Sequence, residues 1–129
     1  MAVQEAVDLR RALAAERPAI FNADLAFSLT HLSACMSAVG RSEEALMTLQ
    51  EVVHLYRTLA VERPAVFTAK FAESLHNFST MVSQVSHKEE ALMAVQEAVE
   101  LRLILAAEQP DLHDDDLEAS LHLLSDILR

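Results

Sequence analysis

The chain has 129 residues, a formal net charge of −10 and 52% hydrophobic residues. This is the length of one ordinary domain. The acidic balance argues against a general affinity for nucleic acid or anionic membranes, because contacts to phosphate need a surplus of Lys and Arg. One Gly, three Pro and no Trp, beside abundant Ala, Leu, Glu and Val, favour helices over strands.

The single Cys35 has no second thiol with which to form an internal disulfide, and its neighbours Ala34 and Met36 place it in an apolar helical stretch. It is interpreted as a structural thiol. No apolar run approaches the ~18 residues of a membrane span, and no basic segment leads into an apolar one at the start of the chain. These features predict a soluble, cytoplasmic protein.

A repeat of 46 residues organises the chain. Prolines at 18, 64 and 110 share this spacing, and so do the Ser-Leu pairs that begin at 28, 74 and 120. Residues 2–21 and 48–67 are identical at 12 of 20 positions without a gap. Such a register indicates a repeat array, divided into a partial repeat over 1–21, full repeats over 22–67 and 68–113, and a partial repeat over 114–129.

Six helices are expected along the chain. In the second, apolar residues at Leu25, Leu29, Leu32 and Met36 follow the spacing of one helical face. Each second helix of a repeat ends before its proline, because the residue before Pro is pushed out of the α region. The expected ranges, in chain order, are 2–16, 23–39, 42–62, 69–85, 87–108 and 115–129.

Turn and cap residues separate these helices. Asn22 and Thr68 stand where N-caps are expected, and Ser86 with Glu89 has the spacing of a capping box. Gly40 and the following Arg interrupt the apolar pattern before the helix at Ser42. The repeat unit is therefore predicted as helix, tight turn, helix and a loop marked by proline.

Small residues at fixed places predict how the helices pack. Ala45 and Ala91 occupy the first turn of the second helices, and Ser33, Ser79 and Ser125 recur along the first helices. They allow two helices to approach closely, so each pair should form a tight antiparallel hairpin. Stacked hairpins predict an all-α fold, a right-handed solenoid of about six helices.

The stretch "SLTHLSACMSAVGRSEEALMTLQEVVHLYRTL" resembles a tetratricopeptide repeat. The residues that carry the resemblance are Leu32, Ser33, Gly40, Ala45 and Leu49, with a proline after the second helix. The phrase "GRSEEAL" is similar to the longer repeats of kinesin light chains. The chain departs from the family pattern in its 46-residue period instead of 34 and in Ser86 at the place of the turn glycine.

The resemblance implies that the first helix of each unit lines a concave groove that binds a peptide. Variation between units at these positions suits a surface that reads a ligand, and it equally suits an unconstrained solvent face. In similar repeats an Asn at the position of Asn77 bonds the peptide backbone, but His31 and Leu123 occupy the equivalent places. The predicted groove residues are Phe27, Thr30, His31, Ala34, Ser37, Glu73, His76, Asn77, Thr80, Gln84, His122 and Asp126.

Metal binding and catalysis find little support in the sequence. His76 and His122 are one period apart and, with Asp126, could approach one another in a stack, although histidines on a polar face are usually plain surface residues. The acidic stretch "DLHDDDLE" lacks the alternation and central Gly of an EF-hand and is interpreted as helix initiation. The chain carries no Gly-rich phosphate loop and no nucleophile motif. We therefore expect no enzyme activity, no cofactor and no metal site.

The expected function is a non-catalytic scaffold that binds a protein or peptide segment. The alternatives are a structural or self-assembling array without a groove ligand, and a regulatory segment of a larger signalling protein. The first and last helices should expose apolar faces, either because the array is longer or because these faces meet in an oligomer. The residues predicted for self-association are Val3, Val7, Leu13, Leu121, Leu124 and Leu128.

Overall fold

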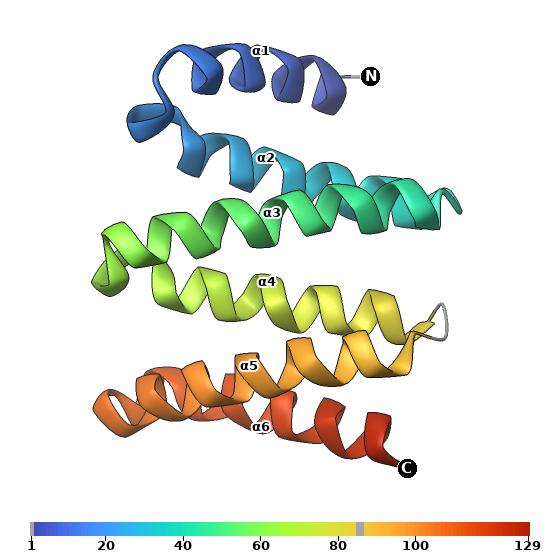
Figure 1. Cartoon of the computed structure of the whole chain (residues 1–129), viewed down its shortest axis with the longest axis vertical. Coiled ribbons are helices and arrows are strands. Elements are labelled where there is room, and N and C mark those ends of the chain that lie inside the picture. Colours follow the sequence, from blue (N-terminus) through green and yellow to red (C-terminus); the bar gives the residue numbers. More distant parts are fainter. Residues whose placement is uncertain (1, 85–86) are drawn as a thin grey trace. The chain divides into compact units, whose positions relative to one another are not determined.

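The computed structural model describes residues 2–84 and 87–129, and in these ranges all regular structure is α-helical (Figure 1). The all-α class is therefore confirmed, with six helices in the described ranges. Their bounds are α1 Ala2–Glu16, α2 Pro18–Ala38, α3 Ser42–Glu62, α4 Pro64–Gln84, α5 Lys88–Glu108 and α6 Pro110–Leu128. The helices form two compact units, residues 1–64 and 65–129.

The first unit holds α1, α2 and α3, in which each helix packs against the next in antiparallel fashion (Figure 1). Its core is built from the apolar face of α2, with Leu29 fully buried, and from Leu49 and Val52 of α3. Burial of each such side chain contributes about 1.5–3 kcal/mol relative to exposure. Ser33 and Ala45 are buried as well, as expected for a close approach of the two helices.

The second unit repeats this arrangement with α4, α5 and α6. Val82 of α4 and Val95 of α5 are fully buried. The hydroxyl of Ser79 donates a hydrogen bond of 2.7 Å to the backbone carbonyl of Ala91, so a side chain of α4 reaches the main chain of α5. This contact confirms that small residues allow the close packing that the sequence predicts.

The turn between α2 and α3 depends on Gly40, whose φ of 83° lies in the left-handed region. The backbone N–H of Arg41 donates to the carbonyl of Met36 at 2.9 Å, and that of Gly40 donates to Ser37 at 3.1 Å. These bonds satisfy carbonyls at the end of α2. The predicted capping box involves Ser86, which lies outside the described residues, and α5 begins at Lys88 after His87.

The junctions before the prolines differ from the prediction. A single residue, Arg17, Arg63 or Gln109, connects each second helix to the next first helix, with nearly the same backbone angles (φ −139°, −138° and −139°). The expected loop and the N-caps at Asn22 and Thr68 are wrong, because the helices begin at the prolines themselves. Proline suits the first helical position, since its fixed φ is helical and the N–H it lacks would have no partner inside the helix.

The hydrogen bonds at these junctions explain why one residue suffices. The N–H of Arg63 still donates to Leu59 at 2.8 Å and that of Gln109 to Leu105 at 2.9 Å, so each connecting residue closes the last turn of the preceding helix. Its ψ, between 72° and 76°, lies outside the α region and redirects the chain into the next helix. None of the described helices is both long and apolar enough to cross a membrane.

Candidate functional site

A buried polar cluster lies inside the second unit, centred on Arg102 of α5. Arg102 is only 7% exposed. Its Nη1 donates to the hydroxyl of Ser120 at 2.7 Å and to the backbone carbonyl of Asp116 at 3.0 Å, and it lies 3.3 Å from Nδ1 of His76. Nδ1 of His76 is also 2.9 Å from the Ser120 hydroxyl. The cluster therefore joins α4, α5 and α6.

The contacts define the protonation state of this cluster. Because Arg102 has no acceptor, Nδ1 of His76 must accept, which places the ring proton on Nε2. Burial lowers the pKa of His76, the charge of Arg102 lowers it further, and Asp116 opposes both effects. Burial also lowers the pKa of Arg102, against the influence of Asp116 and Glu73. Burial and the neighbouring guanidinium therefore both favour the neutral form of His76.

The first unit contains a smaller version of the cluster, two periods earlier in the sequence. Arg10 of α1 donates to the Ser28 hydroxyl, and its Nη1 lies 3.4 Å from the carbonyl of Asp24. Arg10 and Ser28 precede Arg102 and Ser120 by two periods of 46 residues. An Arg on a second helix that reaches a Ser on the next first helix is thus a repeated packing element, which the sequence analysis did not recognise. The sequence signal is the recurrence of Arg in "VDLR" and "VELR" in the same register.

This cluster changes the interpretation of His76, which was expected to face a ligand groove. Its ring is half-buried and bonded to two helices of its own unit. His76 therefore serves internal packing. Within residues 2–84 and 87–129, no three His, Cys, Asp or Glu side chains come together in an arrangement that could hold a metal ion.

The groove candidates on α2 are mostly at the surface. Phe27 is 51% exposed and stacks edge-on against the exposed His31, with ring centroids 4.6 Å apart. Ala34 and Ser37 are exposed, whereas Thr30 is half-buried and donates its hydroxyl to the carbonyl of Ala26 at 2.8 Å.

The candidates on α4 lie on one side of that helix. Glu73, Asn77, Thr80 and Gln84 are spaced by four, three and four residues, which places them in one stripe. Glu73 and Gln84 are exposed, and Asn77 and Thr80 are half-buried. The Thr80 hydroxyl donates to the carbonyl of His76 at 3.1 Å.

On α6, His122 and Asp126 are exposed. Asp126 pairs with Arg129 at 3.5 Å. It also lines a surface depression of about 420 Å³, whose other walls come from the end of α4, the start of α5 and the last turns of α6. The lining residues are Ser83, Lys88, Leu123, Asp126, Ile127 and Arg129.

The depression combines apolar and charged groups. Leu123 and Ile127 supply apolar surface, and Lys88, Asp126 and Arg129 supply both signs of charge. The mixed lining of the depression therefore suits a small contact with a peptide better than a contact with a polyanion.

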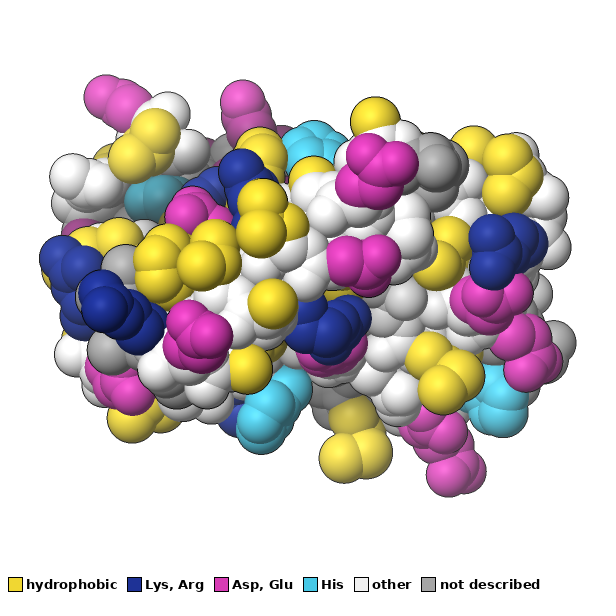
Figure 2. Space-filling view, turned by 90° about the horizontal axis from the view of Figure 1, so that it is seen from above, with side chains coloured by type: hydrophobic (Ala, Val, Ile, Leu, Met, Phe, Trp, Pro, Cys, Tyr) yellow, Lys and Arg dark blue, Asp and Glu magenta, His cyan; other side chains and the backbone are white. Residues whose placement is uncertain are grey.

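On the molecular face drawn in Figure 2, the described Lys and Arg side chains are interspersed with acidic and apolar ones and form no extended basic surface.

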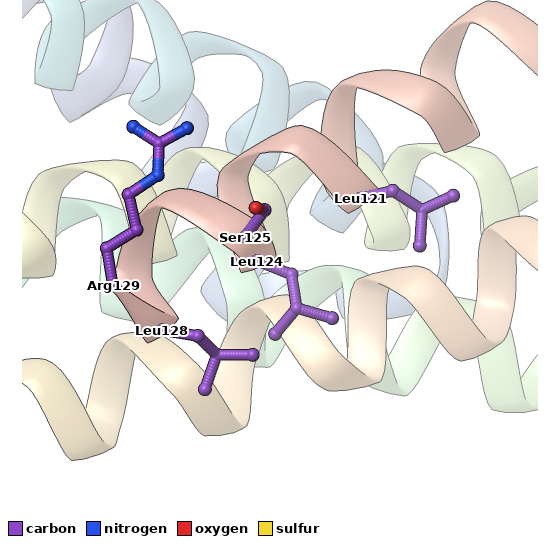
Figure 3. A pocket seen from close by; sticks show the side chains of 5 residues that line it. All are labelled: Leu121, Leu124, Ser125, Leu128 and Arg129. Atoms are coloured by element: carbon purple, nitrogen blue, oxygen red, sulfur yellow. The ribbon is translucent and has the colours of Figure 1, made fainter.

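The residues predicted for self-association divide between the two ends of the chain. The expectation that Val7 is exposed is wrong, because its side chain is fully buried in the first unit. Val3 and Leu13 are half-buried. On α6, Leu121 and Leu128 are exposed and Leu124 is half-buried, and the three point to the same side of the helix (Figure 3).

Comparisons with known proteins give no relative. No protein-family model, no curated protein and no solved structure matches the chain.

Proposed function

We propose that the protein is a non-catalytic, tetratricopeptide-like scaffold that binds a peptide or protein segment. The depression at the end of α6 is the observation that carries the proposal, because it joins apolar surface to charged groups and includes Asp126, one of the predicted ligand positions. The resemblance of the repeat to tetratricopeptide units supports the same function. A cytoplasmic location fits a chain whose single cysteine has no partner for an internal disulfide.

The stripe on α4 supports the proposal independently. Asn77 and Thr80 lie at its centre and are half-buried, so their polar atoms are held on a rigid helix close to the surface. An amide at this place donates and accepts hydrogen bonds, as a peptide backbone requires. The net charge of −10 favours a neutral or basic peptide over an acidic one.

The proposal is tested by screening a peptide library against the full chain and titrating the tightest binders by fluorescence anisotropy. Asn77→Ala and Asp126→Ala should each weaken binding about tenfold, which corresponds to one lost polar contact. Gln96→Ala is the matched control, because Gln96 is exposed on α5 and lies outside both the stripe and the depression. His76→Ala is unsuitable as a groove variant, since it disturbs the buried cluster.

Two results would contradict the proposal. One is a library without any peptide that binds saturably. The other is a set of binders that Asn77→Ala and Asp126→Ala leave as tight as the Gln96→Ala control.

A further inference from the structure

The outer side of α6 carries a stripe of four leucines. Leu117, Leu121, Leu124 and Leu128 are spaced by four, three and four residues, which is the heptad spacing of a helix that packs along a second helix. Leu121 is 45% and Leu128 58% exposed, and the other two are half-buried. A depression of about 330 Å³ follows the stripe, lined by Leu121, Leu124, Ser125, Leu128 and Arg129 (Figure 3).

The repeat shows that this surface belongs to a helix interface. One period earlier, Leu75, Ser79 and Val82 stand at the places of Leu121, Ser125 and Leu128, and all three are almost completely buried. There, Ser79 bonds the backbone of α5. The equivalent side of α6 is exposed, so it is suited to receive a further helix.

We propose that the occupant is a second copy of this chain, which pairs its own α6 with the leucine stripe in an antiparallel, two-fold symmetric dimer. About such an axis, Leu117 lies opposite the partner's Leu128, and Leu121 lies opposite the partner's Leu124. Each leucine then meets a leucine, so the stripe is complementary to itself. Self-complementarity is the requirement for a two-fold interface.

The charges beside the stripe favour the antiparallel direction. At 100° per residue, Asp114, Glu118 and Arg129 lie along one flank of the stripe, and all three are exposed. In the antiparallel pair, Arg129 lies between the partner's Asp114 and Glu118. A parallel pair would instead place this flank of one chain and the same flank of its partner on opposite sides of the interface, so that Arg129 would meet neither Asp114 nor Glu118.

The rival occupant is the α1 helix of a second copy, in a head-to-tail contact. Such a contact is heterologous and gives open stacks or a ring, whereas the two-fold pair stops at two chains.

A single helix pair is small for a protein interface, so the dimer should be weak. The dimeric fraction should therefore rise as the chain concentration is raised. We expect sedimentation equilibrium from low micromolar to near-millimolar chain concentration to give a mass that rises from one chain to two and then stays at two. Leu121→Glu and Leu128→Glu should each keep the mass at one chain. Circular dichroism should show an unchanged helix content, since both side chains are already exposed.

Leu112→Glu is the matched control. Leu112 is 64% exposed on the same helix, and its position is about half a turn of the helix away from the stripe. This variant should dimerise like the unaltered chain, which would separate a specific stripe from general apolar exposure.

A charge exchange tests the direction of pairing without touching the leucines. Arg129→Glu alone and Glu118→Lys alone should each weaken dimerisation about tenfold, because each places like charges together at two symmetric positions. The chain that carries both changes should recover most of the affinity, since the pair is restored with its signs exchanged.

Each contrary result overturns the proposal. These results are a mass of one chain at every concentration, a mass that grows beyond two chains, a dimer that survives Leu121→Glu and Leu128→Glu, and a double charge exchange that fails to restore affinity. A dimer lost in Leu9→Glu, which alters the exposed side of α1, would show head-to-tail association instead.

Discussion

Replacing Arg102 with Met tests whether the buried cluster stabilises the second unit. The methionine fills similar space without charge, so the principal loss is the hydrogen bonding of Nη1 to Ser120 and to the Asp116 carbonyl, at 2.7 and 3.0 Å. Neither acceptor is left orphaned, because the Ser120 hydroxyl keeps its contact with Nδ1 of His76 at 2.9 Å and the Asp116 carbonyl lies within α6.

The expected magnitude follows from two opposing contributions. Hydrogen bonds to a charged group stabilise a fold by about 1.5–3 kcal/mol. Removing the buried guanidinium also relieves its desolvation, which offsets part of this amount. We therefore expect Arg102→Met to lower the free energy of unfolding by about 1–2 kcal/mol.

Urea unfolding followed by circular dichroism measures this change, with an unaltered m-value as the sign that only stability has changed. Arg10→Met is the matched comparison in the first unit. Its effect should be smaller, because Arg10 is half-buried and its contact with the Asp24 carbonyl is longer, at 3.4 Å. A more stable or equally stable Arg102→Met variant would refute the reasoning, since desolvation would then outweigh the hydrogen bonds.

Three further predictions concern single residues. Ser79→Ala should cost about 1 kcal/mol in urea unfolding, because it removes one buried hydrogen bond to Ala91; no loss would show that this bond adds nothing. Gly40→Ala should cost about 1–2 kcal/mol from left-handed strain alone, since open space surrounds an added Cβ; an unchanged urea midpoint would contradict that strain. For His76 the folded pKa lies below the ordinary value of 6.5, so its contribution is fully present above pH 6.5 and is lost as pH falls through the folded pKa. Urea midpoints across the weakly acidic range should show this loss and His76→Gln should reduce it, whereas equal slopes in both chains would contradict it.

The periodic features of the fold were predictable from the sequence because they are local. Apolar residues at helical spacing predict the helices, and the recurrence of Ser79 and Ala91 predicts their close contact. Gly40 marks a turn because only glycine adopts a positive φ without strain. The helix boundaries next to the prolines were predicted wrongly. A proline ends the helix before it and equally begins the helix after it, so the sequence alone favoured a loop where the chain has one connecting residue.

The sequence did not predict which side of each helix is covered by neighbouring helices. The sequence predicts His76 as a polar residue on a variable surface, but its contacts with α5 and α6 make it part of a buried cluster. Val7 reads as an exposed end of the array, yet it is fully buried.

The sequence by itself determined the helical class, the 46-residue register and the residues that recur at packing positions. These follow from local periodicity, which repeats along the chain. The tertiary structure determined that Arg102 donates its hydrogen bonds to groups inside the second unit and that the leucines of α6 face outward. Periodicity assigns residues to a face of a helix, but only the neighbouring helices determine whether that face meets protein or water.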